Sequence, residues 1–192
     1  MKEIYFVTSS KRKVISLQST FSKFMINVKQ VDIELPEIQS LDVEEVAIEK
    51  VKYAFKRIRK HCVVQDSGFY IDSLNGFPGA LVKFILSTID IEGVLKLTEG
   101  KLKTCEFREC LSYMDKDLKQ PICFTHSVKG TISESILGEV NNNGSRLYQI
   151  FIPENTNKTI AQMSVEEHRI WNERTSHKNE VDLANYLNKN LQ

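Results

Sequence analysis

The chain has 192 residues, of which 41% are hydrophobic and 27% charged, and this is enough for one domain with its own hydrophobic core. A formal net charge of +1 argues against a nucleic-acid binder, and the apolar runs are too short for a signal peptide or a membrane span. The four cysteines form no Cys-x-x-Cys pair and the four histidines are scattered, which argues against a zinc site. We therefore expect a cytoplasmic protein with reduced thiols that binds neither nucleic acid nor membrane.

The first half of the chain alternates strand and helix patterns. In chain order we expect a strand over Ile4–Val7, a helix over Lys11–Met25, a strand over Val28–Ile33, a helix over Val43–Lys60, a strand from Val63, and short helices over Ala80–Ser87 and Ile91–Leu97. The third strand leads to Asp66, Ser67 and Gly68, where we expect the strand to end and the backbone to turn. The glycines and proline of Gly76–Gly79 predict a rigid turn.

The second half begins with a hairpin pattern. Its strands alternate in polarity over Cys105–Tyr113 and Ile122–Val128, with a polar turn between them. Further strands are expected near Gly130–Ile132 and Leu147–Ile152, a turn or mobile loop at 141–144, a capping box at Ser164–Glu167, and a last helix with Val181, Ala184, Leu187 and Leu191 on one face. This order predicts a mixed α/β protein.

The segment Thr8–Lys13 lies between the first strand and the first helix. Backbone N–H groups at a helix N-terminus, together with the helix dipole and nearby lysines, form a natural anion site. It is not a Walker A loop, because the required glycines are missing. A capped helix with a solvated basic first turn explains the same residues.

Glu37 and Asp66 stand at predicted exits from two different strands. If those strands are neighbours, both carboxylates could reach one Mg²⁺, which prefers oxygen ligands and substrate phosphates. Two unrelated surface acids would give the same sequence. Lys50 and Lys83 could contact phosphates, although a single lysine on a helix is usually solvated.

Nine segments, taken together in their order along the chain, resemble the inosine triphosphate pyrophosphatases. These enzymes hydrolyse non-standard purine nucleoside triphosphates to the monophosphate and pyrophosphate. The resemblance runs from Ile4 to about Leu187, and its segments are Phe6–Lys13, Leu35–Gln39, Ile48–Lys50, Val64–Gly68, Leu74–Gly79, Val82–Phe84, Phe151–Glu154, Lys158–Ser164 and Ser176–Lys178. Each segment is weak evidence by itself, whereas nine in register indicate homology.

The resemblance implies a role for each matching residue. Those that would bind the substrate are Thr8, Ser10, Lys13, Lys50 and Lys83 on the triphosphate, Ser67 and the turn ending at Gly79 on the phosphate side, and Ser176, His177 and Lys178 on the base side. Glu37 and Asp66 would hold Mg²⁺, and Asp66 and Lys13 would be catalytic. The implied chemistry is in-line attack of water on the α-phosphorus, with Mg²⁺ neutralising charge and Asp66 orienting or deprotonating the water.

The chain departs from the family pattern at several positions. Ser10 replaces an asparagine, Lys178 replaces an arginine, and Gln65 replaces an acidic residue, which we expect to weaken Mg²⁺ binding. A few extra residues fall between Glu167 and Ser176. Of the base-reading Gly-Phe-Gly-Tyr/Trp-Asp-Pro segment, the sequence Gly144–Gln149 keeps only the glycine.

Two side chains of the altered segment remain candidates for contacts with substrate. Tyr148 could stack on a base, and Arg146 could pair with a carbonyl edge or a phosphate. A buried Tyr148 in a plain strand is the alternative.

We therefore expect a Mg²⁺-dependent nucleoside triphosphate pyrophosphatase with altered base selectivity. A catalytically weakened relative that binds a nucleotide or a protein partner is the alternative, and a hydrolase of another phosphorylated metabolite is a third. The resemblance implies one two-lobed domain over residues 1–192, with an elongated mixed sheet flanked by helices and a central cleft. It also implies a homodimer, for which we expect a surface near Cys105–Val128.

Overall fold

The computed structural model describes residues 2–140, 144–175 and 177–190. Its helices are α1 Lys11–Ser22, α2 Val43–Ile58, α3 Val82–Thr88, α4 Asp90–Leu97, α5 Val165–Thr175 and α6 Lys178–Asn190, with 3-10 turns η1 Asp72–Leu74, η2 Arg146–Gln149 and η3 Ile160–Gln162. Its strands are β1 Lys2–Val7, β2 Ile26–Val31, β3 Cys62–Ile71, β4 Pro78–Gly79, β5 Thr104–Met114, β6 Ile122–Ile132 and β7 Phe151–Pro153. The predicted mixed α/β class is confirmed.

A single seven-stranded sheet carries the order β2-β1-β3-β5-β6-β7, and β4 pairs with β3 off this path. β1 is parallel to β2 and to β3, whereas β4 and β7 are antiparallel to their partners. The chain divides into two compact units, the first from residues 1–67, 109–126 and 177–192, and the second from 68–108 and 127–176. The sheet is therefore mixed, and β3, β5 and β6 each contribute to both units.

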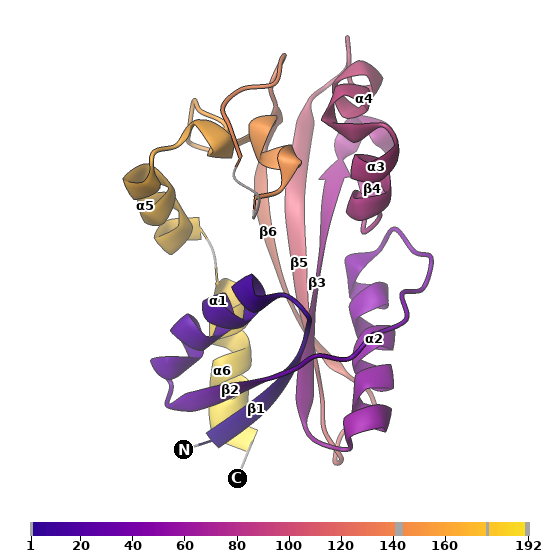
Figure 1. The fold of residues 1–192 in the computed structure, drawn as a ribbon, viewed down its shortest axis with the longest axis vertical. Coiled ribbons are helices and arrows are strands. Elements are labelled where there is room, and N and C mark those ends of the chain that lie inside the picture. The colour runs from indigo at the N-terminus through magenta and orange to yellow at the C-terminus, as the bar shows by residue number, and fades with distance from the viewer. Residues whose placement is uncertain (1, 141–143, 176, 191–192) are drawn as a thin grey trace. The chain divides into compact units, whose positions relative to one another are not determined.

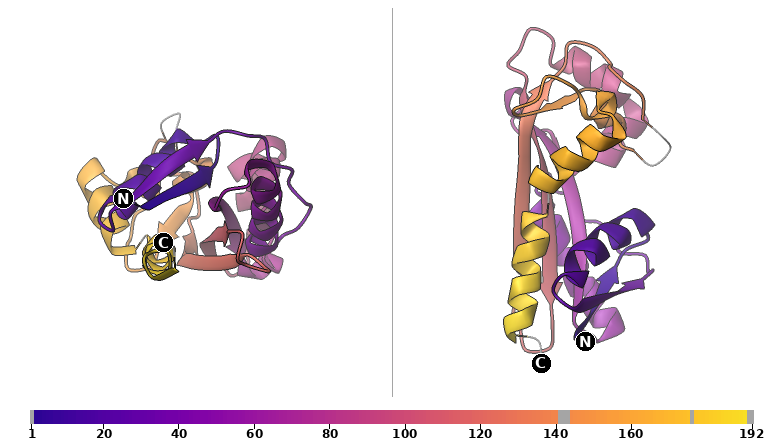
Figure 2. Two further views of the ribbon diagram at one scale, coloured as in Figure 1. Left: turned by 90° about the horizontal axis from the view of Figure 1, so that it is seen from below. Right: turned by 90° about the vertical axis from the view of Figure 1, so that its left-hand side faces the viewer.

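The first unit has its core between the sheet and two helices. Leu17 and Phe21 of α1 and Leu183 and Leu187 of α6 pack with apolar side chains of β1, β2, β3 and β5, among them Val63. α2 lies on the other side of β3 from α1 and α6 (Figure 1). The two ends of the chain meet here, since Nζ of Lys2 donates to the carbonyl of Asn188 at 2.8 Å (Figure 2). The sheet of this unit is thus covered by helices on both faces.

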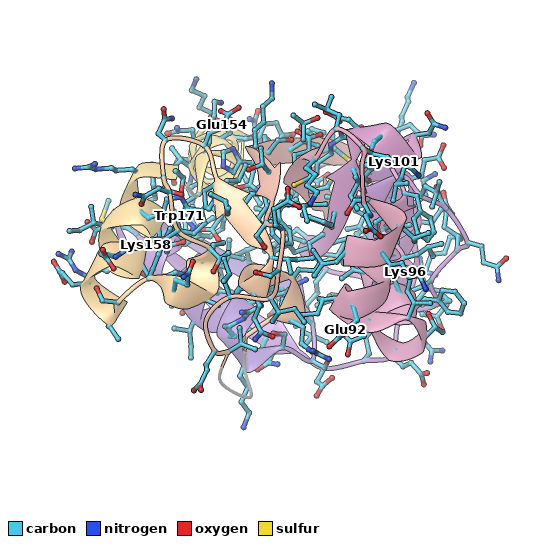
Figure 3. All side chains as sticks on the ribbon, turned by 90° about the horizontal axis from the view of Figure 1, so that it is seen from above. Glu92, Lys96, Lys101, Glu154, Lys158 and Trp171 are labelled. Carbon is cyan, nitrogen blue, oxygen red and sulfur yellow. The ribbon has the colours of Figure 1, made fainter. Side chains whose placement is uncertain are left out.

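The second unit has an aromatic core. Phe69 of β3 lies 4.8 Å from Phe107 of β5, and Phe107 lies 4.8 Å from Phe151 of β7, between ring centroids. Apolar side chains of α3, α4, η2 and η3 complete this core, and Trp171 of α5 packs against it. Figure 3 shows α4, which carries Glu92 and Lys96, and α5, which carries Trp171. Trp171 therefore anchors α5 to this core, while most other residues of α5 are exposed.

The first helix and second strand differ from the prediction at their shared boundary. α1 ends at Ser22 rather than Met25, and β2 runs over Ile26–Val31 rather than Val28–Ile33. Met25 has a positive φ of 57°, which no helix residue adopts, so the chain reverses there. Ile26 is 1% exposed and already belongs to the core, which is why the strand begins with it.

The predicted strand exit at Asp66-Ser67-Gly68 is wrong. β3 continues through these residues to Ile71, because Phe69, Tyr70 and Ile71 are buried and β4 pairs with Phe69 and Tyr70. Gly68 does not turn the chain. A Cβ at Gly68 would lie 2.7 Å from the carbonyl oxygen of Gly79, so the glycine permits the close approach of β4.

The second half of the chain follows the prediction with two corrections. The expected strand at Gly130–Ile132 is the end of β6, and the expected strand at Leu147–Ile152 is the 3-10 turn η2 followed by β7. The predicted hairpin and the Ser164–Glu167 capping box are confirmed, the latter by hydrogen bonds in both directions. Of the expected turn at 141–144, residues 141–143 lie outside the described residues.

All four cysteines are free thiols, and three of them are buried. Burial raises the pKa of Cys62 to about 12, so its thiol stays neutral at ordinary pH. Among the residues that the structure describes, no helix has the length and apolar character needed to cross a membrane.

Candidate active site

Lys50 joins the two carboxylates that the sequence proposed as metal ligands. Its side chain extends from the middle of α2, which begins after the N-cap Asp42. Nζ of Lys50 donates to Oε1 of Glu37 at 2.7 Å and to Oδ2 of Asp66 at 2.7 Å. Because both oxygens bind one nitrogen, they lie no more than twice that distance apart. The structure therefore brings Glu37 and Asp66 together, with a cation between them.

The environment of this group keeps Lys50 charged. Burial of the side chain, which is 10% exposed, would by itself lower the pKa of Lys50. The charge and hydrogen bond of Asp66, followed by those of Glu37, outweigh burial and raise that pKa. The other oxygen of Asp66 accepts the backbone N–H of Ser67 at 2.9 Å. Both oxygens of Asp66 are thus held by donors.

The N-terminus of α1 holds the next group of predicted residues. Ser10 is the N-cap, and its hydroxyl accepts the N–H of Lys13 at 3.4 Å, while Oγ1 of Thr8 accepts the N–H of Ser10 at 3.1 Å. Nζ of Lys13 donates to the backbone carbonyl of Gln65 at 3.1 Å. Lys13 therefore reaches β3 one residue before Asp66.

Gln65 and Asp66 face opposite sides of the sheet, as successive strand residues do. Asp66 points to Lys50 of α2, whereas Gln65 is on the face of Val63, which packs in the core with α1 and α6. Nε2 of Gln65 donates to Oε2 of Glu109 on β5 at 3.1 Å. The side chain at position 65 therefore points away from Lys50, and the expected weakening of Mg²⁺ binding stays a prediction.

Two of the predicted base-side residues, His177 and Lys178, lie at the start of α6. Nδ1 of His177 is 2.9 Å from Oε2 of Glu180, and this hydrogen bond raises the pKa of His177 against the opposing effect of burial. Lys178 pairs along the helix with Asp182 at 2.5 Å. Ser176 lies outside the described residues. His177 is thus fixed by a partner one helical turn away, and Lys178 is at the surface.

The remaining predicted residues belong to the second unit. Gly79 is buried with a φ of 58°, and Lys83 is exposed in the first turn of α3. Tyr148 packs edge-on against Phe107 at 5.8 Å between ring centroids. Arg146 forms ion pairs with Asp90 and with Glu92, which Figure 3 shows on α4. Tyr148 lies in η2, so the alternative of a buried residue in a plain strand is wrong.

The donor set fits a hard divalent cation. Within residues 2–140, 144–175 and 177–190, no three His, Cys, Asp or Glu side chains come together as metal ligands. Mg²⁺ sites at phosphate substrates commonly use only one or two carboxylates, with water and phosphate oxygens as the other ligands. Glu37 and Asp66 already share one cationic group, so their spacing suits this kind of site.

Two charged residues near the predicted site were not found from the sequence. Glu109 was hidden in an alternating strand, where its partner Gln65 is distant in sequence. Glu180 is buried, with 5% exposure, and it contacts α1 as well as His177. The spacing of His177 and Glu180 was a usable signal, because residues three apart share one face at the start of a helix.

The chain is similar to enzymes that act on nucleoside triphosphates. It is 34% identical over 189 residues to the dITP/XTP pyrophosphatase of Thermococcus kodakarensis, with 97% of each chain covered. It is 34% identical over 166 residues to the protein of that name from Methanopyrus kandleri, with 86% of each covered. The corresponding protein of Saccharolobus solfataricus is 36% identical over 162 residues, covering 84% of this chain and 82% of the relative.

Solved structures share the fold. The Ham1 protein of Staphylococcus aureus superposes with a TM-score of 0.79 at 24% identity, covering 98% of this chain and 99% of that one. A HAM1 protein from Coxiella burnetii gives 0.81 at 20% identity, covering 98% and 100%. The model of the Ham1 family matches residues 4–180. These matches confirm the resemblance found in the sequence motifs, and the chain belongs to the Ham1 family.

Proposed function

We propose that this chain hydrolyses non-standard purine nucleoside triphosphates, such as dITP and XTP, to the nucleoside monophosphate and pyrophosphate. The relatives named dITP/XTP pyrophosphatase support the reaction and the substrate class. Within the chain, the observation that carries the proposal is the Glu37–Lys50–Asp66 group, which places two carboxylates around one ammonium.

The first unit offers a binding surface for a triphosphate. Lys13 and Lys50 supply positive charge, and Thr8 and Ser10 place the N-terminus of the 12-residue helix α1 beside Lys13. Glu37 and Asp66 would hold Mg²⁺ together with phosphate oxygens. When bound, this ion supplies positive charge against the charge that develops on those oxygens. The lysines would orient the triphosphate for attack at its α-phosphorus.

Asp66 is the proposed acceptor for the attacking water. Lys50 and the N–H of Ser67 hold its two oxygens, so the carboxylate has one orientation. In the proposed step Asp66 orients or deprotonates the water, which attacks in line with the departing pyrophosphate. Lys13 would stabilise negative charge on the phosphates, as a fixed cation close to β3.

The base side is where we propose altered selectivity. Ser176 and His177 match the family motif, and Lys178 replaces the arginine of that motif. A planar guanidinium that can form two parallel hydrogen bonds is thus replaced by the point charge of an ammonium group. Arg146 and Tyr148 have partners within the second unit, in Asp90 and Phe107. We also propose that Gly79 and Lys83 contact the phosphates and that Tyr148 stacks on the base. We also propose a homodimer in the cytoplasm.

A nucleotide-binding protein without turnover is the second candidate. It is favoured by the lost base-reading segment and by Gln65, whose amide pairs with Glu109. Hydrolysis separates the two candidates directly, because a binding protein would show affinity for triphosphates in calorimetry without releasing pyrophosphate.

The test is pyrophosphate release with Mg²⁺ from ITP, XTP, dITP, dUTP and the standard triphosphates. We expect release from the 6-oxopurine nucleotides and a fall of roughly a hundredfold or more in Asp66→Asn, the size of a general-base contribution. Asp117→Asn, in an exposed turn, is the matched control and should act as wild type. No release from any triphosphate, or equal activity in Asp66→Asn, contradicts the proposal.

A further inference from the structure

A buried carboxylate stands at the start of α6, outside the residues that the family motif supplies. Glu180 has a side chain that is only 6% exposed. Its Oε1 accepts the hydroxyl of Ser16 at 3.2 Å, and its Oε2 accepts the hydroxyl of Thr20 in a short hydrogen bond. Both hydroxyls come from α1. A buried carboxylate costs free energy unless it is fully hydrogen-bonded, and Glu180 meets this condition.

The third partner of Glu180 is the ring of His177. Nδ1 of His177 lies 2.9 Å from Oε2 of Glu180, and the ring is 28% exposed. His177 has a φ of 83°, a left-handed conformation that favours glycine, so its backbone is held against its own preference. The buried carboxylate of Glu180 thereby fixes the orientation of the ring.

Other charged groups act on the same ring. Glu109 of β5 attracts the protonated form, and Lys23, just after α1, opposes it. The hydrogen bond with Glu180 is the largest influence and raises the pKa of His177, while burial works in the opposite direction. The carboxylates of Glu180 and Glu109 together outweigh the charge of Lys23 and the effect of burial, so the protonated form of His177 is favoured.

The contact with Glu180 also decides what the other ring nitrogen can do. With Nδ1–H donated to the carboxylate, Nε2 is the nitrogen that serves the remaining contacts of the ring. The imidazolium presents Nε2–H as a charged donor, whereas the neutral ring in this tautomer presents an acceptor. A 6-oxopurine needs a donor at its carbonyl, and a 6-aminopurine needs an acceptor at its amino group.

We propose that Glu180 is a positioning residue that fixes His177 as a charged hydrogen-bond donor for the 6-oxo group of the purine. Glu109 assists from β5, where Gln65 holds its carboxylate. The proposal rests on the proposed function, in which His177 lies on the base side of the nucleotide. It makes base selectivity depend on the charge of His177. At pH values below the pKa of His177 the protein should favour dITP over dATP, and this preference should fall as the ring loses its proton.

The first test is an NMR titration of the His177 ring in the whole protein, with the signal assigned by its loss in His177→Gln. In the wild type we expect a pKa above the ordinary value of about 6.5. Glu180→Gln should lower it and Glu109→Gln should lower it less. Glu173→Gln, which changes an exposed carboxylate of α5, is the matched control and should leave it unchanged. A wild-type pKa at or below the ordinary value overturns the proposal, even if Glu180→Gln does not fold.

The second test is the ratio of kcat/KM for dITP to that for dATP as a function of pH. We expect the ratio to fall by about tenfold as His177 deprotonates, the cost of one charge-assisted hydrogen bond, and to fall at lower pH in Glu180→Gln. A purely structural Glu180 would reduce activity without moving the pH at which the ratio changes, and that result overturns the proposal. If no triphosphate is hydrolysed, the proposed function and the base-reading role fail together. The titration still decides whether Glu180 positions the ring.

Discussion

The ammonium group of Lys50 and the carboxylate of Asp66 form a largely buried ion pair, with 2.7 Å between Nζ and Oδ2 and side-chain exposures of 10% and 15%. The pair connects the middle of α2 to the middle of β3. Glu37 shares the same ammonium group but is 54% exposed, so it can also turn to water. The ammonium group of Lys50 therefore both stabilises the buried Asp66 and occupies the space between the two proposed metal ligands.

Lys50→Met should destabilise the protein and create a stronger response to Mg²⁺. Loss of the ammonium leaves Asp66 buried without its cation, at a cost of about 3 kcal/mol in unfolding free energy, the lower end of the range for broken buried pairs. The two carboxylates then lack a counter-charge that Mg²⁺ can supply. Millimolar Mg²⁺ should therefore raise the Tm of Lys50→Met more than that of the wild type. If Mg²⁺ raises the Tm of the wild type and of Lys50→Met equally, the carboxylate pair is not the metal site. The same conclusion follows if Mg²⁺ raises the Tm of the double variant Lys50→Met/Asp66→Asn as much as that of Lys50→Met.

Gly68→Ala should destabilise the protein through a steric clash. The added Cβ would lie 2.7 Å from the carbonyl oxygen of Gly79, and β3 and β4 would have to separate. We expect a loss of about 2–3 kcal/mol in unfolding free energy. Gly100→Ala is the control, since its Cβ would meet nothing within 4 Å and only its φ of 68° is unfavourable. It should lose about 1 kcal/mol. Equal losses in denaturant titrations would contradict the close-approach explanation.

A charge exchange between β3 and β5 tests the Gln65–Glu109 contact. Gln65→Glu places a second carboxylate where Nε2 of Gln65 now lies 3.1 Å from Oε2 of Glu109. Both residues are partly exposed, so we expect a loss of about 1 kcal/mol. The double variant Gln65→Glu/Glu109→Gln restores one acid and one amide and should recover most of the loss. Additive effects of the two changes would show that the side chains do not interact.

The charge of His177 should make stability depend on pH. The pKa of His177 is raised in the folded protein by its hydrogen bond with Glu180. The folded state therefore binds the proton more tightly than the unfolded state, and this contribution is fully present below the unfolded value of about 6.5. It is lost as pH rises through the higher folded value. Urea titrations across this range should show the unfolding free energy falling with pH, and His177→Gln should flatten that part of the profile.

The sequence predicted the fold where the signal is local. α2 was predicted within two residues because its apolar positions repeat at helical spacing and Asp42 caps it. β3 was cut short because Asp66-Ser67-Gly68 favours a turn locally. What extends the strand is its pairing with β4, eight or more residues further along the chain, and the burial of Phe69–Ile71. The pairing with β4 is a contact that the residues next to Gly68 do not encode.

The candidate site was predicted only in part, because its contacts join residues that are distant in sequence. Glu37 and Asp66 were linked by their places at predicted strand exits and by the family resemblance, and Lys50 was proposed for phosphate. No sequence pattern indicated that one ammonium joins the two carboxylates. Glu109 meets Gln65 only because β3 and β5 are neighbours in the sheet. Arg146 was expected to reach a base or a phosphate, and its pairing with α4 is a contact that the sequence around it does not suggest.

Hydrolysis of dITP or XTP in ¹⁸O-labelled water with Mg²⁺, followed by mass analysis of the products, shows which phosphorus the water attacks. Attack of water on the α-phosphorus, with Asp66 as the acceptor, predicts that the label enters the nucleoside monophosphate and that unlabelled pyrophosphate is released. Asp66→Asn should form these products at least a hundredfold more slowly. Label in the pyrophosphate or in inorganic phosphate, or the absence of any hydrolysis, would contradict the account.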